Sequence, residues 1–228
     1  MLDERLSLAA ALYEPCQWGA DIGTDHAYLP CHLLRRGVCK RMIVSDVSPK
    51  ALDRARVNIA HRGLSDRAVL ALADGLDAID RPCGCVSIMG MGGETMAQIL
   101  QSGADKLQGA ALVLSAHTEQ HLVRAALADI GYRIAQERLC RAAGRFYIFW
   151  QARPGTEEQT PEAIRFGGLL WQEEPALLQE YCRWRIRVLT GMLAGLRSAA
   201  TPDDAAILAA GTDIAFYRQR LTELEDML

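Results

Sequence analysis

The chain of 228 residues lacks several features that would place it in other classes of protein. It has no run of about 18 apolar residues, so no membrane-spanning helix is expected. Its start, Met1 to Arg5, lacks the basic end and the long apolar segment of a signal peptide. Its seven cysteines form no C-x-x-C motif, which argues against a zinc knuckle and a disulfide framework. We therefore expect a cytoplasmic protein with buried thiols and no metal.

The composition is that of a globular protein with unevenly distributed charge. Half of the residues are hydrophobic and 23% are charged, which is enough to form a core. Residues 1–153 hold 18 Lys and Arg against 16 Asp and Glu, whereas residues 154–228 hold 7 against 12. Eight basic residues cluster in the first part: Arg35, Arg36, Lys40, Arg41, Arg54, Arg56, Arg62 and Arg67. They could meet the phosphates of a nucleic acid or form an ordinary solvated helix face, and charge alone does not decide.

Short apolar runs alternate with helical patterns up to about residue 150. This alternation predicts a mostly parallel sheet covered by helices on both faces. Only a loop, Cys140–Arg145, separates the last two strands, so they should pair as a hairpin at the sheet edge. The expected strands are Gln17–Ile22, Arg41–Asp46, Ala68–Ala73, Cys85–Met89, Ala111–Ser115, Tyr132–Leu139 and Phe146–Gln151. The expected helices are Leu29–Arg36, Pro49–His61, Glu94–Leu107 and Glu119–Ile130.

The sequence after Arg153 changes character, so we expect a first domain over 1–153 and a helical domain over 154–228. Two long helical patterns there predict an antiparallel hairpin resembling a coiled coil. Two helices packed on the main domain are the alternative. The expected seam comprises Leu170, Leu177, Tyr181, Trp184, Val188, Gly191 and Gly195 on one helix, and Ile207, Ala210, Ile214, Tyr217, Leu221, Leu224 and Leu228 on the other.

Four predicted strands end in acids or glycines that could bind a ligand. Asp21 and Gly23 end the first strand, Asp46 the second and Asp74 the third, and glycines follow the fourth. Ligands of open parallel sheets bind at this edge, and a carboxylate ending the second strand can accept both ribose hydroxyls. The pattern therefore predicts an adenosine-containing ligand.

The turn after the first strand favours S-adenosylmethionine over a dinucleotide. A pyrophosphate requires G-x-G-x-x-G, but the sequence reads G-T-D-H-A-Y, with Asp25 in place of the second glycine. A carboxylate there repels phosphates and attracts the sulfonium and ammonium groups of the methyl donor. Asp74 could accept from the adenine amino group while the N–H of Gly75 reaches a ring nitrogen. Asp74 and Asp25 could instead cap the turns that follow them.

These motifs resemble those of a known family. D-I-G-T-D-H-A-Y-L-P, D-V before a proline-led helix, A-D-G-L and G-M-G-G-E-T-M are similar to the bacterial tRNA (adenine-N1)-methyltransferases that modify position 22 in the D-arm. The resemblance is strongest over Leu2–Leu107. It implies a class I methyltransferase fold (Rossmann-like, α/β, with a mostly parallel seven-stranded sheet), S-adenosyl-L-methionine as donor, and a C-terminal coiled coil that helps to hold tRNA. The sequence departs from the family pattern at Ser115-Ala116-His117 and over Arg141–Ile148, so the resemblance supports the donor more strongly than the acceptor.

The expected site follows from the motifs and the resemblance. Asp25 and His26 are candidates to balance or remove the charge left on a methylated adenine, with Glu94 as a weaker third. The expected donor-binding residues are Asp21, Gly23, Thr24, Asp25, His26, Leu29, Pro30, Asp46, Val47, Asp74, Gly75, Leu76, Met89 and Gly90. The expected substrate-binding residues are Tyr28, Met91, Gly92, Gly93, Arg35 and Arg36.

Several of these residues have a second interpretation. His26 could hold the donor's carboxylate or the turn itself, and Tyr28 could lie in the core or on a helix surface. Met91 and Met96 could simply pack. His117 and His121 share a helix face, but no third metal ligand is evident. The function expected is methyl transfer to N1 of a tRNA adenine by a monomer or weak dimer; the alternatives are another acceptor or a catalytically silent tRNA-binding module.

Overall fold

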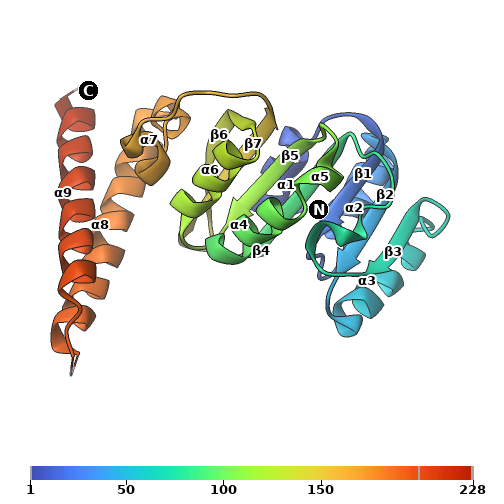
Figure 1. Cartoon of the computed structure of the whole chain (residues 1–228), viewed down its shortest axis with the longest axis horizontal. Coiled ribbons are helices and arrows are strands. Elements are labelled where there is room, and N and C mark those ends of the chain that lie inside the picture. Colours follow the sequence, from blue (N-terminus) through green and yellow to red (C-terminus); the bar gives the residue numbers. More distant parts are fainter. Residues whose placement is uncertain (1, 200, 227–228) are drawn as a thin grey trace. The chain divides into compact units, whose positions relative to one another are not determined.

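The computed structural model describes residues 2–199 and 201–226, and its centre is one seven-stranded sheet (Figure 1). The strand order is β3-β2-β1-β4-β5-β7-β6, in which β1 to β5 run parallel and β7 runs antiparallel to β5. The predicted edge hairpin is therefore confirmed. The strands are β1 (Cys16–Ile22), β2 (Cys39–Asp46), β3 (Ala68–Leu72), β4 (Cys85–Met91), β5 (Ala111–Ala116), β6 (Tyr132–Ala142) and β7 (Arg145–Pro154).

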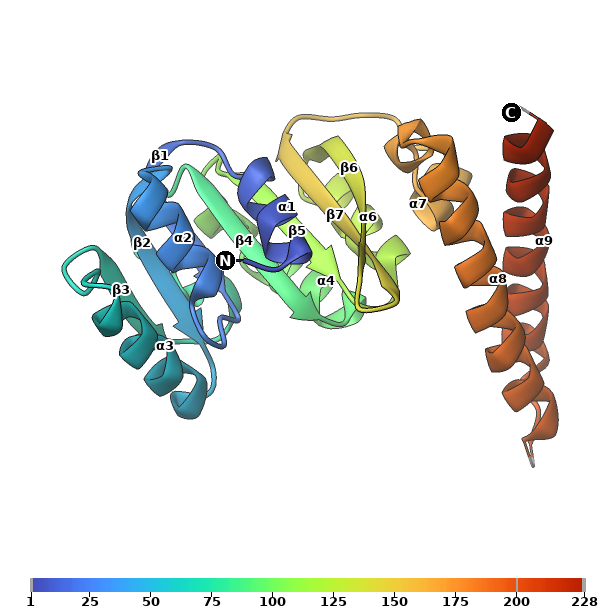
Figure 2. The same ribbon diagram turned by 180° about the vertical axis from the view of Figure 1, so that it is seen from behind.

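Helices cover both faces of the sheet, as the alternating pattern predicts. One face carries α1 (Glu4–Leu12), α2 (Tyr28–Arg36) and α3 (Pro49–His61), which lie in front of the strands in Figure 2. The other face carries α4 (Gly93–Ser102), α5 (Ala104–Leu107) and α6 (Gln120–Asp129). The single helix expected over Glu94–Leu107 is thus divided at Gly103. None of the described helices is long and apolar enough to cross a membrane.

The helix α1 was not predicted, although its start carries a recognisable signal. Oδ1 of Asp3 accepts a hydrogen bond of 2.9 Å from the backbone N–H of Leu6, so Asp3 is the N-cap. The helix buries Ala9 and Leu12 in the same cluster as Leu33 and Met42. A nine-residue helix of this kind depends on that packing more than on its own sequence.

A buried ion pair extends the first compact unit beyond the predicted boundary. Arg124, only 1% exposed, donates from Nε and Nη2 to Oε1 of Glu137 at 2.9 and 2.7 Å. Oε2 of Glu137 accepts from the N–H of Leu170 at 2.9 Å, and Nη1 of Arg124 donates to the carbonyl of Ile164 at 3.2 Å. These bonds tie α7 (Pro161–Phe166) and the start of η2 (Leu169–Gln172) to α6 and β6. The first unit accordingly continues to Leu170 rather than ending at Arg153.

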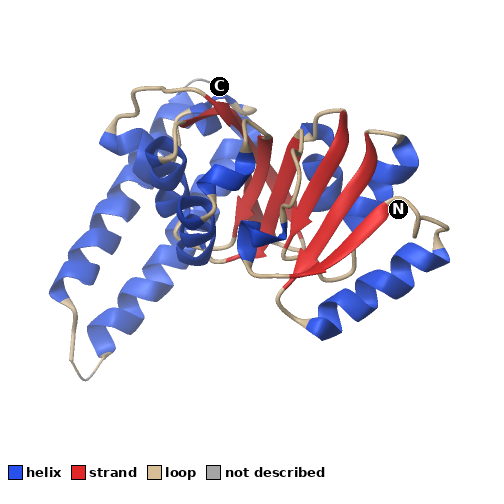
Figure 3. Cartoon of the chain, turned by 45° about the vertical axis from the view of Figure 1, so that its right-hand side comes forward, coloured by secondary structure: helices blue, strands red, loops and turns tan. Residues whose placement is uncertain are grey.

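The second unit contains the predicted helical hairpin, formed by α8 (Pro175–Ser198) and α9 (Asp204–Asp226) (Figure 3). Nε2 of Gln179, near the start of α8, donates to the carbonyl of Leu224, near the end of α9, so the helices are antiparallel. The unit also includes the β6–β7 turn, Ala143–Phe146, where Phe146 packs against Tyr181 and Trp184 with ring centroids 5.6 Å away in both cases.

The predicted seam is confirmed on α9 and only partly on α8. Ala210, Ile214, Tyr217 and Leu224 are buried, as is Tyr181 on α8. In contrast, Val188 is 43% exposed, and Gly191 and Gly195 are exposed with no atom near their side-chain positions. The buried line of α8 instead runs through Leu178, Cys182 and Leu189. The expectation that Gly191 and Gly195 let the two backbones approach closely is therefore wrong, because both glycines face open space. Leu228 lies outside the described residues.

Candidate functional site

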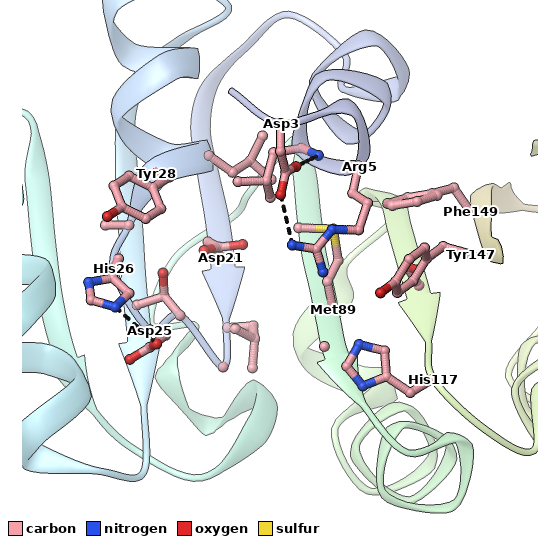
Figure 4. Close-up of a pocket in the computed structure, with 18 residues that line it drawn as sticks. Asp3, Arg5, Asp21, Asp25, His26, Tyr28, Met89, His117, Tyr147 and Phe149 are labelled. Carbon is pink, nitrogen blue, oxygen red and sulfur yellow. Dashed lines mark hydrogen bonds and ion pairs between the residues drawn. The ribbon is translucent and has the colours of Figure 1, made fainter. Parts of the chain in front are cut away.

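A pocket of about 440 Å³ opens at the carboxyl ends of β1, β4 and β5 (Figure 4). The turn after β1 supplies Asp21, Gly23, Thr24, Asp25 and His26, and the start of α2 supplies Tyr28 and Leu29. Met89 and Gly90 come from β4, at a register shift between Met89 and Met91. Every one of these residues was predicted to bind donor or substrate. The assigned roles of the individual residues remain predictions.

Asp21 is a buried acid at the base of the pocket. It is 6% exposed, and its Oδ1 accepts a 2.5 Å hydrogen bond from the hydroxyl of Ser87 on β4. Burial raises the pKa of the Asp21 carboxyl, the charge of Asp46 raises it further, and hydrogen bonds from Ser87 and Thr24 oppose the rise. No described Lys or Arg side chain forms an ion pair with it. Since buried charges are normally paired, a cationic ligand fits this position.

The one-glycine turn is held by the neighbouring strand. Gly23 has φ +76°, a left-handed conformation that glycine adopts without strain. The N–H groups of Gly23 and Thr24 both donate to the carbonyl of Ser45, at 2.9 and 2.8 Å. The turn is thereby tied to β2, and the Met91 side chain lies against it, with Cε 2.9 Å from where a Cβ of Gly23 would be.

Asp25 and His26 line the pocket but are engaged with other groups. The Asp25 carboxylate accepts from Nε of Arg54 at 2.8 Å, pairs with Nη2 of the same arginine, and lies 3.2 Å from Nε2 of His26. It does not cap α2, whose N-cap is Ala27 without a side-chain bond.

Tyr28 lies on the surface beside the pocket and not in the core. It is 47% exposed, and its ring stacks on His26 with centroids 5.2 Å apart and planes at 19°. The guanidinium of Arg62 lies 5.9 Å from the Tyr28 ring centroid. The backbone carbonyl of His26 accepts from Nδ2 of Asn58 at 2.6 Å, which fixes the turn against α3.

Asp46 and Asp74 end adjacent strands but do not line the pocket. Oδ1 of Asp46 accepts from the N–H of Ser48 at 2.7 Å, leaving Oδ2 for a ligand, and the N–H of Ala73 reaches the Asp46 carbonyl at 3.4 Å. The Asp74 side chain is exposed and makes no capping bond to η1 (Gly75–Ala78), so the capping interpretation is wrong. Of the other predicted donor residues outside the pocket, Val47 is exposed, Gly75 is half-buried, and Pro30 and Leu76 are buried.

The glycines after β4 serve packing. A Cβ on Gly93 would lie 2.3 Å from the carbonyl oxygen of Glu119 and 2.5 Å from that of Thr118. This close approach between backbones accounts for Gly93, and a Cβ on Gly92 would meet Thr118 at 3.3 Å. The sequence predicts that both bind the substrate, and neither lines the pocket. Met96 is fully buried, as its packing interpretation predicts.

Three further charged residues among the predictions do not line the pocket. Glu94 is exposed on the first turn of α4 and does not line the pocket. Arg35 and Arg36 are exposed on the last turn of α2, whose first turn lines the pocket. Neither arginine lines the pocket, and their predicted contact with the substrate stays a prediction.

Nine residues that line the pocket had no role assigned from the sequence, and two of them, Ile22 and Ala27, flank the turn after β1. Asp3, Arg5 and Leu6 come from the start of α1, Ser115 and His117 from the end of β5, and Tyr147 and Phe149 from β7. Ser115, His117 and Tyr147 fall where the sequence departs from the family pattern, which was the available signal. The rings of His117 and Tyr147 are 6.1 Å apart. Among the described residues, no group of three or more His, Cys, Asp or Glu could hold a metal ion.

The fold and the pocket together define a class of protein. Five parallel strands followed by an antiparallel β7, with acids at the carboxyl ends of β1 and β2, form the sheet of a Rossmann-like methyltransferase.

Comparison with known proteins identifies the family. Residues 2–149 match the sequence model of the methyltransferase domain, and the chain belongs to this family. The chain is 28% identical over 165 residues to the tRNA (adenine(22)-N(1))-methyltransferase of Bacillus subtilis, covering 72% of this chain and 69% of that protein. A Streptococcus pneumoniae structure, described as a candidate tRNA (m1A22) methyltransferase in complex with S-adenosyl-L-methionine, is 28% identical, with a TM-score of 0.84 over 97% of this chain and 100% of that chain. A Streptococcus agalactiae structure of the NADB-Rossmann superfamily is 27% identical, with a TM-score of 0.86 over 97% of both chains.

Proposed function

We propose that this protein transfers a methyl group from S-adenosyl-L-methionine to N1 of an adenine in tRNA, at position 22 in the D-arm. The buried Asp21 carboxylate, with no described cationic partner, is the observation that carries the proposal. The family match and the B. subtilis relative, named for this reaction, support it.

The residues present fit the donor. When bound, S-adenosylmethionine supplies a methyl group on a positively charged sulfur. Asp21 offers a carboxylate to the cationic end, and the free oxygen of Asp46 offers an acceptor to ribose hydroxyls. Asp74, exposed and without a capping bond, can accept from the adenine amino group. These residues bind and orient the donor.

The acceptor is proposed to enter between β4 and β7. A ring nitrogen has a lone pair in the base plane, so the site has to align nitrogen, methyl and sulfur and requires no strong base. Met89 and Gly90 line this region from β4, and His117 and Tyr147 lie on the side of Met89 away from the turn after β1 in Figure 4. In a folded arm the adenine must first be freed from pairing or stacking.

The helical hairpin is proposed to help hold tRNA. We assign the methyltransferase activity to the first unit, which contains the whole pocket. A tRNA substrate also implies a cytoplasmic location, and we expect a monomer or weak dimer.

A transfer assay on unmodified tRNA transcripts tests the proposal. We expect labelled methyl from S-adenosylmethionine to appear as 1-methyladenosine in transcripts with adenine at position 22. A matched transcript with guanine at that position serves as the control and should remain unlabelled.

Mass spectrometry of tRNA nucleosides from a deletion strain gives the second test. Loss of 1-methyladenosine, restored by the wild-type gene, supports the proposal. If another modified nucleoside disappears while 1-methyladenosine is unchanged, the chain uses the same donor on another acceptor. If no S-adenosylmethionine binds in calorimetry, the chain is a tRNA-binding module without catalysis.

A further inference from the structure

The pocket contains an unassigned arginine, Arg5. Among the residues that the structure describes, it is the only Lys or Arg that lines the pocket. Its side chain extends from α1 toward Met89 and Tyr147 (Figure 4). The guanidinium lies 5.1 Å from the centroid of the Tyr147 ring.

Asp3 fixes the orientation of Arg5. One oxygen of Asp3 accepts from the N–H of Leu6 and caps α1, while the other accepts from Nη2 of Arg5 at 2.7 Å. Asp3 and Tyr147 both raise the pKa of Arg5, which is already charged at any physiological pH. A guanidinium has five N–H groups, so these contacts leave donors for a further anion.

The other charges in the pocket indicate which anion the remaining N–H groups of Arg5 can bind. The methionine end of the donor carries an ammonium and a carboxylate side by side. Asp21 and Asp25 suit the ammonium, but their negative charge would repel the carboxylate. His26 is the other candidate partner, and it already lies 3.2 Å from the Asp25 carboxylate. A permanent cation with a planar fork is the better partner for a carboxylate.

We infer that Arg5 binds the α-carboxylate of S-adenosylmethionine, and that Asp3 is the positioning residue that holds Arg5 for this contact. This inference rests on the proposed function only as far as the identity of the donor. It gives the start of α1 a role in donor binding, in addition to the motifs at the strand ends.

Calorimetry with two ligands tests the inference on the full-length chain. Decarboxylated S-adenosylmethionine keeps the sulfonium and ammonium groups and lacks only the carboxylate. We expect Arg5→Gln to raise the Kd for S-adenosylmethionine about tenfold or more, and to change the Kd for the decarboxylated compound by less than about twofold. Arg5→Lys, which keeps the charge without the fork, should give an intermediate loss.

Arg81→Gln is the matched control. Like Arg5, Arg81 pairs with a nearby aspartate, Asp80, and lies over an aromatic ring, that of Trp18 at 4.4 Å. It does not line the pocket, so its loss should leave both Kd values unchanged. Asp3→Ser keeps a good N-cap and removes the anchor of Arg5; we expect a smaller loss that is again confined to S-adenosylmethionine.

Three results would overturn the inference. The first is an unchanged Kd for S-adenosylmethionine in Arg5→Gln, and the second is an equal loss for both compounds. The third is an unchanged donor Kd with a raised KM for tRNA, which would place Arg5 at the acceptor. If the wild type binds no S-adenosylmethionine, the proposed function fails together with the inference. If donor binding follows the expected pattern but no tRNA is methylated, only the proposed acceptor fails.

Discussion

The hydroxyl of Ser87 on β4 donates a 2.5 Å hydrogen bond to the carboxylate of Asp21 on β1. This bond crosses between paired strands, Asp21 lying in register with Ser87. It lowers the cost of a buried acid without supplying a positive charge, so the site keeps an unpaired carboxylate for its ligand.

Asp21→Asn should weaken donor binding without lowering the thermal stability of the protein. The amide keeps an acceptor for Ser87 and loses the charge, so the Kd for S-adenosylmethionine should rise about tenfold or more in calorimetry. The raised pKa means that the ionised carboxyl disfavours the folded state at neutral pH. The Tm of the variant at pH 7 should therefore be no lower than that of the wild type, and a lower Tm would contradict this account of Asp21.

Donor affinity should depend on pH through the same group. Because the pKa of Asp21 is raised, its charge is present above that pKa and is lost as the pH falls through it. Affinity should thus decline on acidification starting above the ordinary aspartate range of about 3.9. Calorimetry between about pH 5 and 8 measures this. Ser87→Ala removes a hydrogen bond that lowers the pKa of Asp21, so it should move the decline in donor affinity to higher pH. Asp21→Asn should abolish the part of the pH dependence that comes from Asp21.

Glu137→Ala should be strongly destabilising. It leaves Arg124 buried without its ionic partner, which typically costs about 3–5 kcal/mol. Urea unfolding gives the free energy. Glu225→Ala is the matched control, because it removes the half-exposed pair with Arg183 and should cost less than about 1 kcal/mol. Equal losses in the two variants would refute the role given to the buried pair.

Deleting the helical hairpin should spare the donor and weaken tRNA binding. A chain ending at Leu170 keeps the carbonyl of Ile164 and the N–H of Leu170 that complete the Arg124–Glu137 network. It should bind S-adenosylmethionine like the full chain, measured by calorimetry, and tRNA more weakly, measured by filter binding. A chain ending at Arg153 lacks those partners and should be less stable than the chain ending at Leu170. Unchanged tRNA affinity without the hairpin would remove its proposed role.

The local sequence was sufficient for most of the fold. Ser48 and Pro49 start α3 where predicted, with the Ser48 hydroxyl as the cap, and all seven strands lie at their predicted positions to within a few residues. Capping residues and apolar runs act over short distances, so they can be read from the chain. The positions of Asp21, Asp46 and Asp74 at strand ends follow in the same way, because parallel strands bring their carboxyl ends to one edge; their role in donor binding stays a prediction.

Contacts between distant parts of the chain required the tertiary structure. The approach of Arg5 to Tyr147, the pairing of Arg124 with Glu137 and Leu170, and the packing of Gly93 on residues 118 and 119 join segments that no periodicity relates. On α8 the sequence favoured Leu177 and Val188, whereas the structure buries their neighbours Leu178 and Leu189, a choice that depends on tertiary packing. The sequence alone determined which strand ends carry the acids proposed to bind the donor. The tertiary structure decided which cation lines the pocket together with Asp21, since that depends on where α1 packs.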